Sequence, residues 1–159
     1  MSGVVLWRIA TDTPDYLADD VSGKGAELSG GRWNAVGTPM LYTSPTIAMV
    51  CLETIVHLDG SKSLPMNRYL VRFDVPDEVW AQLTTIDAAS NVGWDAVPAG
   101  KVSIDWGTKW CAGLTSALVL VPSVVVPEEF NVLVNPRHTD ASKLKATKIR
   151  KWTYDPRAQ

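Results

Sequence analysis

The chain has 159 residues, 46% apolar and 20% charged, and we expect residues 1–159 to form one globular domain. Its net charge of −2 excludes a general electrostatic attraction to nucleic acid. No stretch reaches the ~18 apolar residues of a membrane span, and no basic segment precedes an apolar run at the N-terminus. We therefore expect a cytoplasmic protein that contacts no membrane.

The first elements in chain order are a strand, a long loop and a second strand. Residues 4–9 are mainly β-branched, aromatic or leucine, which favours a strand. Residues 15–31 are polar and contain four glycines, which predicts a loop with a helical turn near residues 15–19. This loop matches neither the P-loop nor the Rossmann glycine pattern. Residues 40–43 form an apolar run, which predicts a short buried strand.

A helix is predicted next, with Ser44 as its N-cap and Pro45 at its first helical position. It is expected to run to about Leu58, with Gly60 as the stop signal. Glu53 falls at the border of its apolar stripe, where a carboxylate is half-buried. The stripe recurs at helical spacing: Ile47, Val50, Cys51, Thr54, Ile55 and Leu58.

Strands and helices then follow one another irregularly. The predicted elements are a strand at 69–75, a short helix at 76–83, a loop at 91–101, a helix capped by Ser103, a strand at 117–121 that continues at 124–126 after a break at Pro122-Ser123, a strand at 131–134 and a last strand within 149–154. Because no regular βαβα alternation appears, we predict an α+β fold with a mixed or mainly antiparallel sheet and flanking helices.

The two cysteines, Cys51 and Cys111, both lie in apolar, helix-like patterns. Without a secretory signal, buried free thiols are expected rather than a disulfide. Thiol chemistry would need an exposed, polar cysteine, which neither residue offers.

Metal and serine-hydrolase chemistry have little support. The only histidines are His57 and His138, and no HExxH motif or cysteine pair accompanies them. No GxSxG elbow is present. A basic cluster near the C-terminus is expected to be a solvated face rather than a phosphate-binding strip. It comprises Lys143, Lys145, Lys148, Arg150 and Lys151.

Arg32, Tyr42 and Glu53 form the most informative group. The guanidinium of Arg32 can bind a diphosphate bidentately, and the ring of Tyr42 can stack on a flat heterocycle. Glu53 can stabilise the positive charge that grows on a ribose as its base departs. Each also has a structural alternative: Arg32 could pair with a surface acid, Tyr42 could be core, and Glu53 could be a helix-face charge.

Segments along nearly the whole chain resemble the RES family, the toxin halves of bacterial toxin–antitoxin pairs whose antitoxins are Xre-like helix-turn-helix proteins. The matching segments are Leu6-Trp7-Arg8-Ile9-Ala10, Gly31-Arg32-Trp33-Asn34, Leu41-Tyr42, Leu52-Glu53-Thr54-Ile55-Val56-His57, Gly107-Thr108-Lys109-Trp110, Leu120-Val121-Pro122-Ser123-Val124-Val125-Val126-Pro127, Asn131-Val132-Leu133-Val134-Asn135-Pro136-Arg137-His138 and Asp155-Pro156-Arg157. They occur in the order found in the family.

The resemblance implies a fold like that of ADP-ribosyltransferase toxins and an activity that consumes NAD as substrate, with no cofactor and no metal. By position, Arg32, Tyr42, Glu53 and Ser123 take the family's arginine, tyrosine, glutamate and serine. Ser116 is the less favoured candidate for the serine. NAD hydrolysis, NAD phosphorolysis and ADP-ribosyl transfer all remain open.

These assignments give a mechanism. Arg32 holds the diphosphate or the nicotinamide ribose, and Tyr42 packs on the nicotinamide. Ser123 bonds the ribose or carboxamide and orients Glu53, which stabilises the oxocarbenium ion. Arg8 is a second phosphate-binding candidate, with a first-strand surface residue as the equal alternative.

The resulting hypothesis is a toxin that arrests growth by hydrolysing or phosphorolysing NAD. An Xre-like antitoxin would cover the active site and would supply any DNA binding, and a homodimer within that complex is allowed. The alternatives are an ADP-ribosyltransferase for one protein, a non-catalytic nucleotide-binding or interaction module, and an esterase-like hydrolase that uses Ser123 without an evident base.

Overall fold

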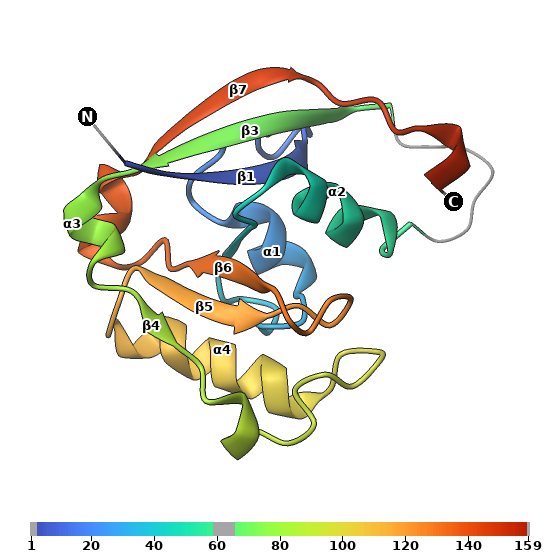
Figure 1. Cartoon of the computed structure of the whole chain (residues 1–159). Coiled ribbons are helices and arrows are strands. Elements are labelled where there is room, and N and C mark those ends of the chain that lie inside the picture. The colour runs from blue at the N-terminus through green and yellow to red at the C-terminus, as the bar shows by residue number, and fades with distance from the viewer. Residues whose placement is uncertain (1–2, 59–65, 159) are drawn as a thin grey trace.

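The structure is a computed structural model that describes residues 3–58 and 66–158, and within them it contains two sheets (Figure 1). The three-stranded sheet is antiparallel, in the order β1-β3-β7. The four-stranded sheet has the order β2-β6-β5-β4 and is antiparallel except where β4 runs parallel to β5. The strands are β1 (Val4–Thr11), β2 (Leu41–Thr43), β3 (Arg68–Val75), β4 (Thr84–Thr85), β5 (Leu118–Pro122), β6 (Phe130–Val134) and β7 (Lys145–Lys151).

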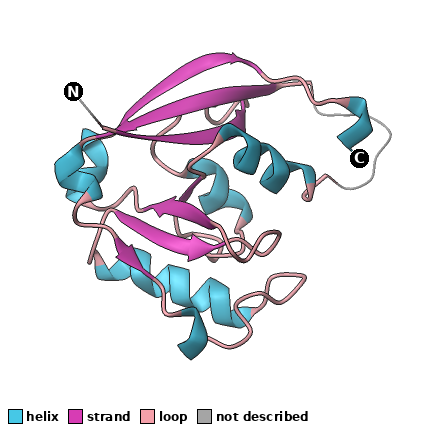
Figure 2. Ribbon diagram, in the orientation of Figure 1, coloured by secondary structure: helices cyan, strands magenta, loops and turns pink. Residues whose placement is uncertain are grey.

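Helices flank both sheets, which confirms the predicted α+β class. In Figure 2, α4 lies along the outer side of the four-stranded sheet and α2 lies next to the three-stranded one. The helices are α1 (Lys24–Ser29), α2 (Ile47–Ile55), α3 (Asp77–Trp80) and α4 (Lys101–Gly113), with short 3-10 turns η1 (Ala88–Ser90), η2 (Thr139–Lys143) and η3 (Pro156–Ala158). No helix in the described ranges is long and apolar enough to cross a membrane.

The side chains of β5 and β6 alternate between two apolar clusters. Leu118 and Val132 face the core between the two sheets, where they meet Phe73 of β3. Val119 and Leu133 face the other way, toward α4. Because successive strand residues point to opposite faces, a sheet that is covered on both sides reads as a continuous apolar run. This explains why the two strands were recognisable in the sequence.

Trp7 and Ser44 join the two sheets. The backbone N–H of each donates to the carbonyl of the other at 2.9 Å. This bridge ties the middle of β1 to the residue that follows β2. It brings Arg8 of the first sheet close to Tyr42 of the second, which is where the candidate site lies.

The predicted start of α2 was wrong by two residues. Ser44 is used in the bridge to β1, and Thr46 is the N-cap instead, accepting a hydrogen bond from the N–H of Met49 at 3.1 Å. The helix ends at Ile55 rather than at Leu58. The predicted stop at Gly60 lies outside the described residues. On the predicted stripe only Val50 is fully buried, and Met49 joins it.

Other differences concern where elements begin and end. The loop at 15–31 contains α1 instead of a helical turn at 15–19, and α4 begins at Lys101, two residues before Ser103, which is buried inside the helix. Residues 124–126 bend rather than continue β5. The last strand, β7 (Lys145–Lys151), begins before the predicted span of 149–154 and overlaps it only at residues 149–151. Both cysteines are free; Cys111 is buried as expected, but Cys51 is only half-buried.

Candidate active site

Glu53 lies on α2 and is held from the four-stranded sheet. Its Oε1 accepts hydrogen bonds from the hydroxyl of Ser123 at 2.5 Å and from Nδ2 of Asn131 at 3.0 Å. The other oxygen, Oε2, has no hydrogen-bond partner among the described residues. The side chain is half-buried, as its place on the apolar stripe predicted. The carboxylate is therefore fixed on one oxygen and open on the other.

Ser123 follows β5 directly and is 1% exposed. Its Oγ accepts the N–H groups of Val125 and Val126, both at 3.1 Å, because the chain bends back on itself after Pro122. Its single hydroxyl proton goes to Glu53. A hydroxyl with both lone pairs occupied is a poor nucleophile, which argues against an esterase that uses Ser123. The geometry instead matches the predicted role of orienting Glu53.

Tyr42 lies on β2, and its hydroxyl is fully engaged. It donates to Oδ1 of Asn34 at 2.5 Å and accepts the backbone N–H of Trp33 at 3.0 Å. Burial raises the pKa of Tyr42 above its usual range, so the phenol keeps its proton. The hydroxyl thus holds the turn that carries Arg32, while the half-buried ring packs against the apolar cluster that contains Trp33 and Met40.

Arg32 lies in this turn, between α1 and β2. Its Nη1 donates to the carbonyls of Trp94 and Ala96 at 3.0 and 2.8 Å, while Nε and Nη2 have no partner in the described chain. Burial lowers the pKa of Arg32, and the charge of Glu53 opposes this shift. Within the described ranges no ion pair joins the two side chains. Arg32 and Glu53 are therefore close enough for their charges to interact, but they do not form a direct ion pair.

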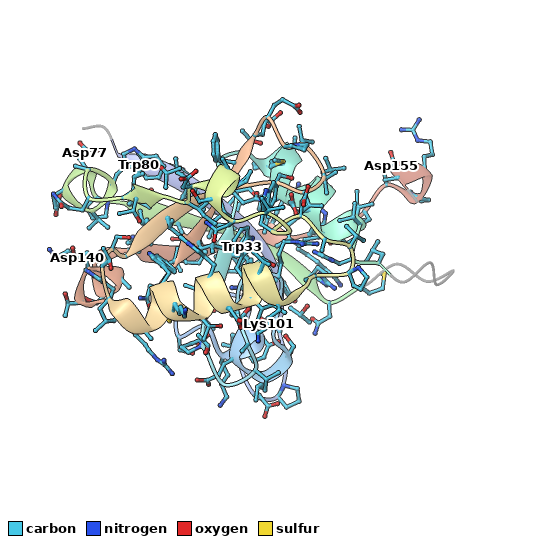
Figure 3. All side chains as sticks on the ribbon, turned by 90° about the horizontal axis from the view of Figure 1, so that it is seen from below. Trp33, Asp77, Trp80, Lys101, Asp140 and Asp155 are labelled. Atoms are coloured by element: carbon cyan, nitrogen blue, oxygen red, sulfur yellow. The ribbon has the colours of Figure 1, made fainter. Side chains whose placement is uncertain are left out.

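The turn that carries Arg32 packs against α4 and is held by contacts among Trp33, Trp94 and Trp106. Trp33 stacks on Trp94 with ring centroids 6.2 Å apart and meets Trp106 edge-on at 5.9 Å. Trp33 is labelled beside α4 in Figure 3. The hydroxyl of Thr108 on α4 accepts the N–H of Ala35 at 3.0 Å. A segment without regular structure is therefore fixed by aromatic packing and by a helix.

Arg8 was predicted either to bind phosphate or to be a first-strand surface residue, and the surface alternative was wrong. Its Nη1 is shielded from solvent and has no hydrogen-bond partner among the described residues. Burial lowers its pKa, opposed by Asp20, Tyr16 and Tyr42. Leu6 and Ala10, two residues away on either side, point into the core between the sheets. A buried guanidinium with an unused donor next to Tyr42 is consistent with an anion-binding role.

The structure brings together Arg32, Tyr42, Glu53 and Ser123, with Arg8 next to Tyr42, but it places Ser116 elsewhere. The hydroxyl of Ser116 lies 2.8 Å from that of Thr84, accepts from Nε1 of Trp110 at 3.1 Å and donates to the carbonyl of Leu118 at 2.9 Å. It is buried where α4 leads into β5 and has no contact with Glu53. Ser123 is the serine of this group.

Asn131 was missed as a site residue, although it begins the family-like segment that runs to His138. The available signal was a polar side chain within an otherwise apolar strand. Its second contact is with Ser44, whose hydroxyl donates to Oδ1 at 2.7 Å. The sequence pattern predicts only a helix cap at Ser44 and gives no sign of this contact.

The histidines and the basic cluster lie outside this group. His57 is exposed, and Nδ1 of His138 caps η2. The described residues contain no cluster of three or more side chains that could hold a metal ion. Most of the basic cluster lies on β7, at the edge of the three-stranded sheet, where Lys148 pairs with Asp12 at 2.9 Å.

Comparison with known proteins identifies the family. The family model described as the RES domain matches residues 5–156. The chain belongs to the RES domain family. This RES domain protein is 56% identical over 152 residues to the "Prs ADP-ribosylating toxin" of a Sphingobium species, covering 95% of this chain and 94% of that relative. It is 36% identical over 155 residues to "Toxin Res" of Yersinia enterocolitica, covering 97% and 99% of the two chains.

Among solved structures, the RES domain protein resembles a chain of the M. tuberculosis MbcT-MbcA toxin-antitoxin complex. The TM-score is 0.64 at 19% identity, over 93% of this chain and 85% of that one. At this identity the likeness concerns the fold, and it agrees with the predicted resemblance to known toxins. The sequence relatives, matched over nearly their whole length, make this chain a RES-family toxin.

Proposed function

We propose that this RES-family toxin cleaves the bond between nicotinamide and ribose in NAD and transfers the ADP-ribose to a protein. One observation carries the proposal: Glu53 is fixed through Oε1 by Ser123 and Asn131, while Oε2 is open in the field of Arg32. A carboxylate held with one free oxygen can stabilise a developing positive charge without rearranging first.

The cationic groups support a dinucleotide substrate. Arg32 and Arg8 both act electrostatically on Tyr42, so the tyrosine ring lies in the field of two guanidinium groups. Arg32 has Nε and Nη2 available, and Arg8 has an unused Nη1. Two guanidinium groups with free donors suit the two phosphates of NAD, and the ring of Tyr42 suits its nicotinamide.

The chemistry needs no strong general acid. The C–N bond to the ribose breaks, and its electron pair goes to the ring nitrogen of nicotinamide, which thereby loses its positive charge. The ribose becomes an oxocarbenium ion, which Oε2 of Glu53 stabilises. A nucleophile of the acceptor then forms a bond to the anomeric carbon and releases its proton to solvent. This is consistent with a site in which neither histidine takes part.

Similarity to a relative is the basis for the acceptor that we propose. The Sphingobium relative is named as a toxin that ADP-ribosylates Prs. Since more than half of the aligned residues are identical, Prs is the acceptor we propose for this chain too. Water or phosphate, favoured from the sequence alone, is the second candidate, because the same Glu53 geometry would serve either one.

The test mixes the purified chain with NAD and purified Prs and follows both free nicotinamide and the mass of Prs. We expect nicotinamide release and Prs carrying ADP-ribose. Glu53→Gln should abolish both, whereas Glu78→Gln, at an exposed carboxylate on α3, should change neither. Nicotinamide release with unmodified Prs would favour hydrolysis or phosphorolysis. No release at all would favour a non-catalytic module.

We also propose an Xre-like antitoxin that covers Glu53 and neutralises the toxin. The fold likeness to a chain of a toxin–antitoxin complex supports an antitoxin partner. Expression of the chain alone should stop growth, and co-expression with the cognate antitoxin should restore it. Normal growth on expression of the chain alone, with the protein soluble and present, would contradict this proposal.

A further inference from the structure

Asn131 connects Glu53 to the junction of the two sheets. Its Nδ2 donates to Oε1 of Glu53 at 3.0 Å, and its Oδ1 accepts from the hydroxyl of Ser44 at 2.7 Å. Ser44 is 2% exposed, and its backbone forms the bridge to Trp7. The carboxylate on α2 is thus linked through β6 to the point where β1 meets β2.

The direction of these hydrogen bonds is fixed by the carboxylate. An ionised Glu53 can only accept, so Asn131 must turn its Nδ2 toward it. The flipped amide would place Oδ1 against Oε1 as two acceptors in contact, which is repulsive. With Nδ2 committed, Oδ1 faces Ser44, whose hydroxyl must then donate. Every donor in the series Ser44, Asn131, Glu53 therefore points toward the carboxylate.

A glutamate needs such external donors to be oriented. The last torsion of its side chain, about the bond to the carboxylate carbon, is broad and has no strong preference of its own. Two donors on the same oxygen restrain this torsion and stabilise the negative charge on Oε1. Oε2 is the oxygen left without a hydrogen-bond donor among the described residues.

We propose that Asn131 and Ser44 are positioning residues of this toxin, which orient Glu53 so that Oε2 faces the reacting ribose. Neither touches the substrate in this role, and both act through Glu53. The inference rests on the proposed NAD cleavage, because it concerns how that reaction uses its carboxylate. It predicts that their loss lowers kcat and leaves the KM for NAD unchanged.

The first test measures nicotinamide release by purified variants in the presence of purified Prs, at saturating and limiting NAD. Asn131→Ala should lower kcat about 100-fold, the scale of a misplaced reacting group, with KM unchanged. Ser44→Ala should lower kcat less, because the amide stays in place and loses only its orienting partner. Asn67→Ala and Ser142→Ala, at exposed positions outside the site, are the matched controls and should keep the wild-type kcat.

The double variant separates positioning from independent damage. If Ser44 acts only through Asn131, the Ser44→Ala, Asn131→Ala pair should be no slower than Asn131→Ala alone. If the losses in kcat of the two single variants were fully additive in the double variant, Ser44 would not act through Asn131, and this part of the proposal would be wrong. Unchanged kcat in Asn131→Ala would overturn the proposal directly.

A second variant guards against misfolding. Asn131→Asp keeps the size of the side chain and an acceptor for Ser44, but it places a second carboxylate against Glu53. It should be slower than Asn131→Ala while melting as a folded protein. Wild-type activity in Asn131→Asp would mean that only the shape of residue 131 matters. If wild-type protein releases no nicotinamide, the proposed function fails; if it does and the variants match it, this inference alone fails.

Discussion

Gly107 of α4 packs directly on the backbone of Trp33. A Cβ at position 107 would lie 1.8 Å from the carbonyl oxygen of Trp33, a distance that no side chain tolerates. The helix can approach the Arg32 turn this closely only because residue 107 has no side chain. A glycine inside a helix is otherwise unfavourable by about 1 kcal/mol relative to alanine.

Gly107→Ala should therefore damage the site despite its better helix propensity. The turn must move away from α4, which should raise the KM for NAD and lower the free energy of unfolding by about 1–3 kcal/mol, as for an overpacked core. Gly113→Ala is the matched control in the same helix. The nearest atom to its new Cβ would be the hydroxyl of Thr115 at 3.7 Å, an ordinary contact. Equal melting temperatures and KM values for the two variants would contradict this account.

Tyr42→Phe should separate the hydroxyl of Tyr42 from its ring. It leaves the N–H of Trp33 and Oδ1 of Asn34 without their partner, which should cost about 1–3 kcal/mol of stability, measured by urea unfolding. The KM for NAD should rise because the Arg32 turn loses its anchor. Tyr42→Ala, which also removes the ring, should bind NAD more weakly still. Identical KM values for the two would remove the ring from the binding site.

Arg32→Ala should weaken NAD binding by about 10- to 100-fold, from roughly 1.5–3 kcal/mol for a lost charged hydrogen bond. It should also release the segment around Trp94, which Nη1 now holds, and so change the tryptophan fluorescence of the free protein. Arg157→Ala, whose guanidinium bonds only Asp155 among the described residues, is the control. Unchanged NAD affinity, measured by calorimetry, would take Arg32 out of the site.

Asp12 should make stability depend on pH in the acid range. The N–H of Ala18 and the ammonium of Lys148 hold the pKa of Asp12 below its usual value of about 3.9. A lowered folded pKa means that the contribution is complete above the unfolded pKa and is lost as the pH falls through the folded one. Asp12→Asn should therefore have a lower Tm than wild type at pH 7. The difference in Tm between the two proteins should become smaller near pH 3. If the difference in Tm between wild type and Asp12→Asn stayed constant from pH 7 to pH 3, Asp12 would not contribute to the pH dependence of stability.

The sequence predicted the long, apolar elements well and the short ones poorly. β5 and β6 were found because both of their faces are buried, which leaves an unbroken apolar run. α1 has only six residues, contains Gly25 and buries none of its side chains, so it carries no apolar period. β4 has two residues and exists only through its pairing with β5. Ser44 looked like a cap because its tertiary partners, Trp7 and Asn131, are distant in the chain.

The candidate residues could be named from the sequence, but their arrangement in space could not. Glu53 and Ser123 are 70 positions apart and share a hydrogen bond that no local pattern encodes. Asn131 was overlooked because its role arises only once α2 faces β6. The resemblance to the RES family named the candidate residues, and the structure showed which of them form hydrogen bonds to the Glu53 carboxylate.

The buried hydroxyl of Ser123 has a consequence for chemical profiling. Fluorophosphonate probes label serines whose oxygen can attack, and this oxygen accepts two N–H groups and is 1% exposed. We expect no fluorophosphonate adduct on Ser123 by mass spectrometry, even in fully active toxin. A covalent inhibitor of the kind that reacts with serine hydrolases would therefore leave this protein unmodified. An electrophile placed to meet Oε2 of Glu53 would instead find an oxygen without a hydrogen-bond partner.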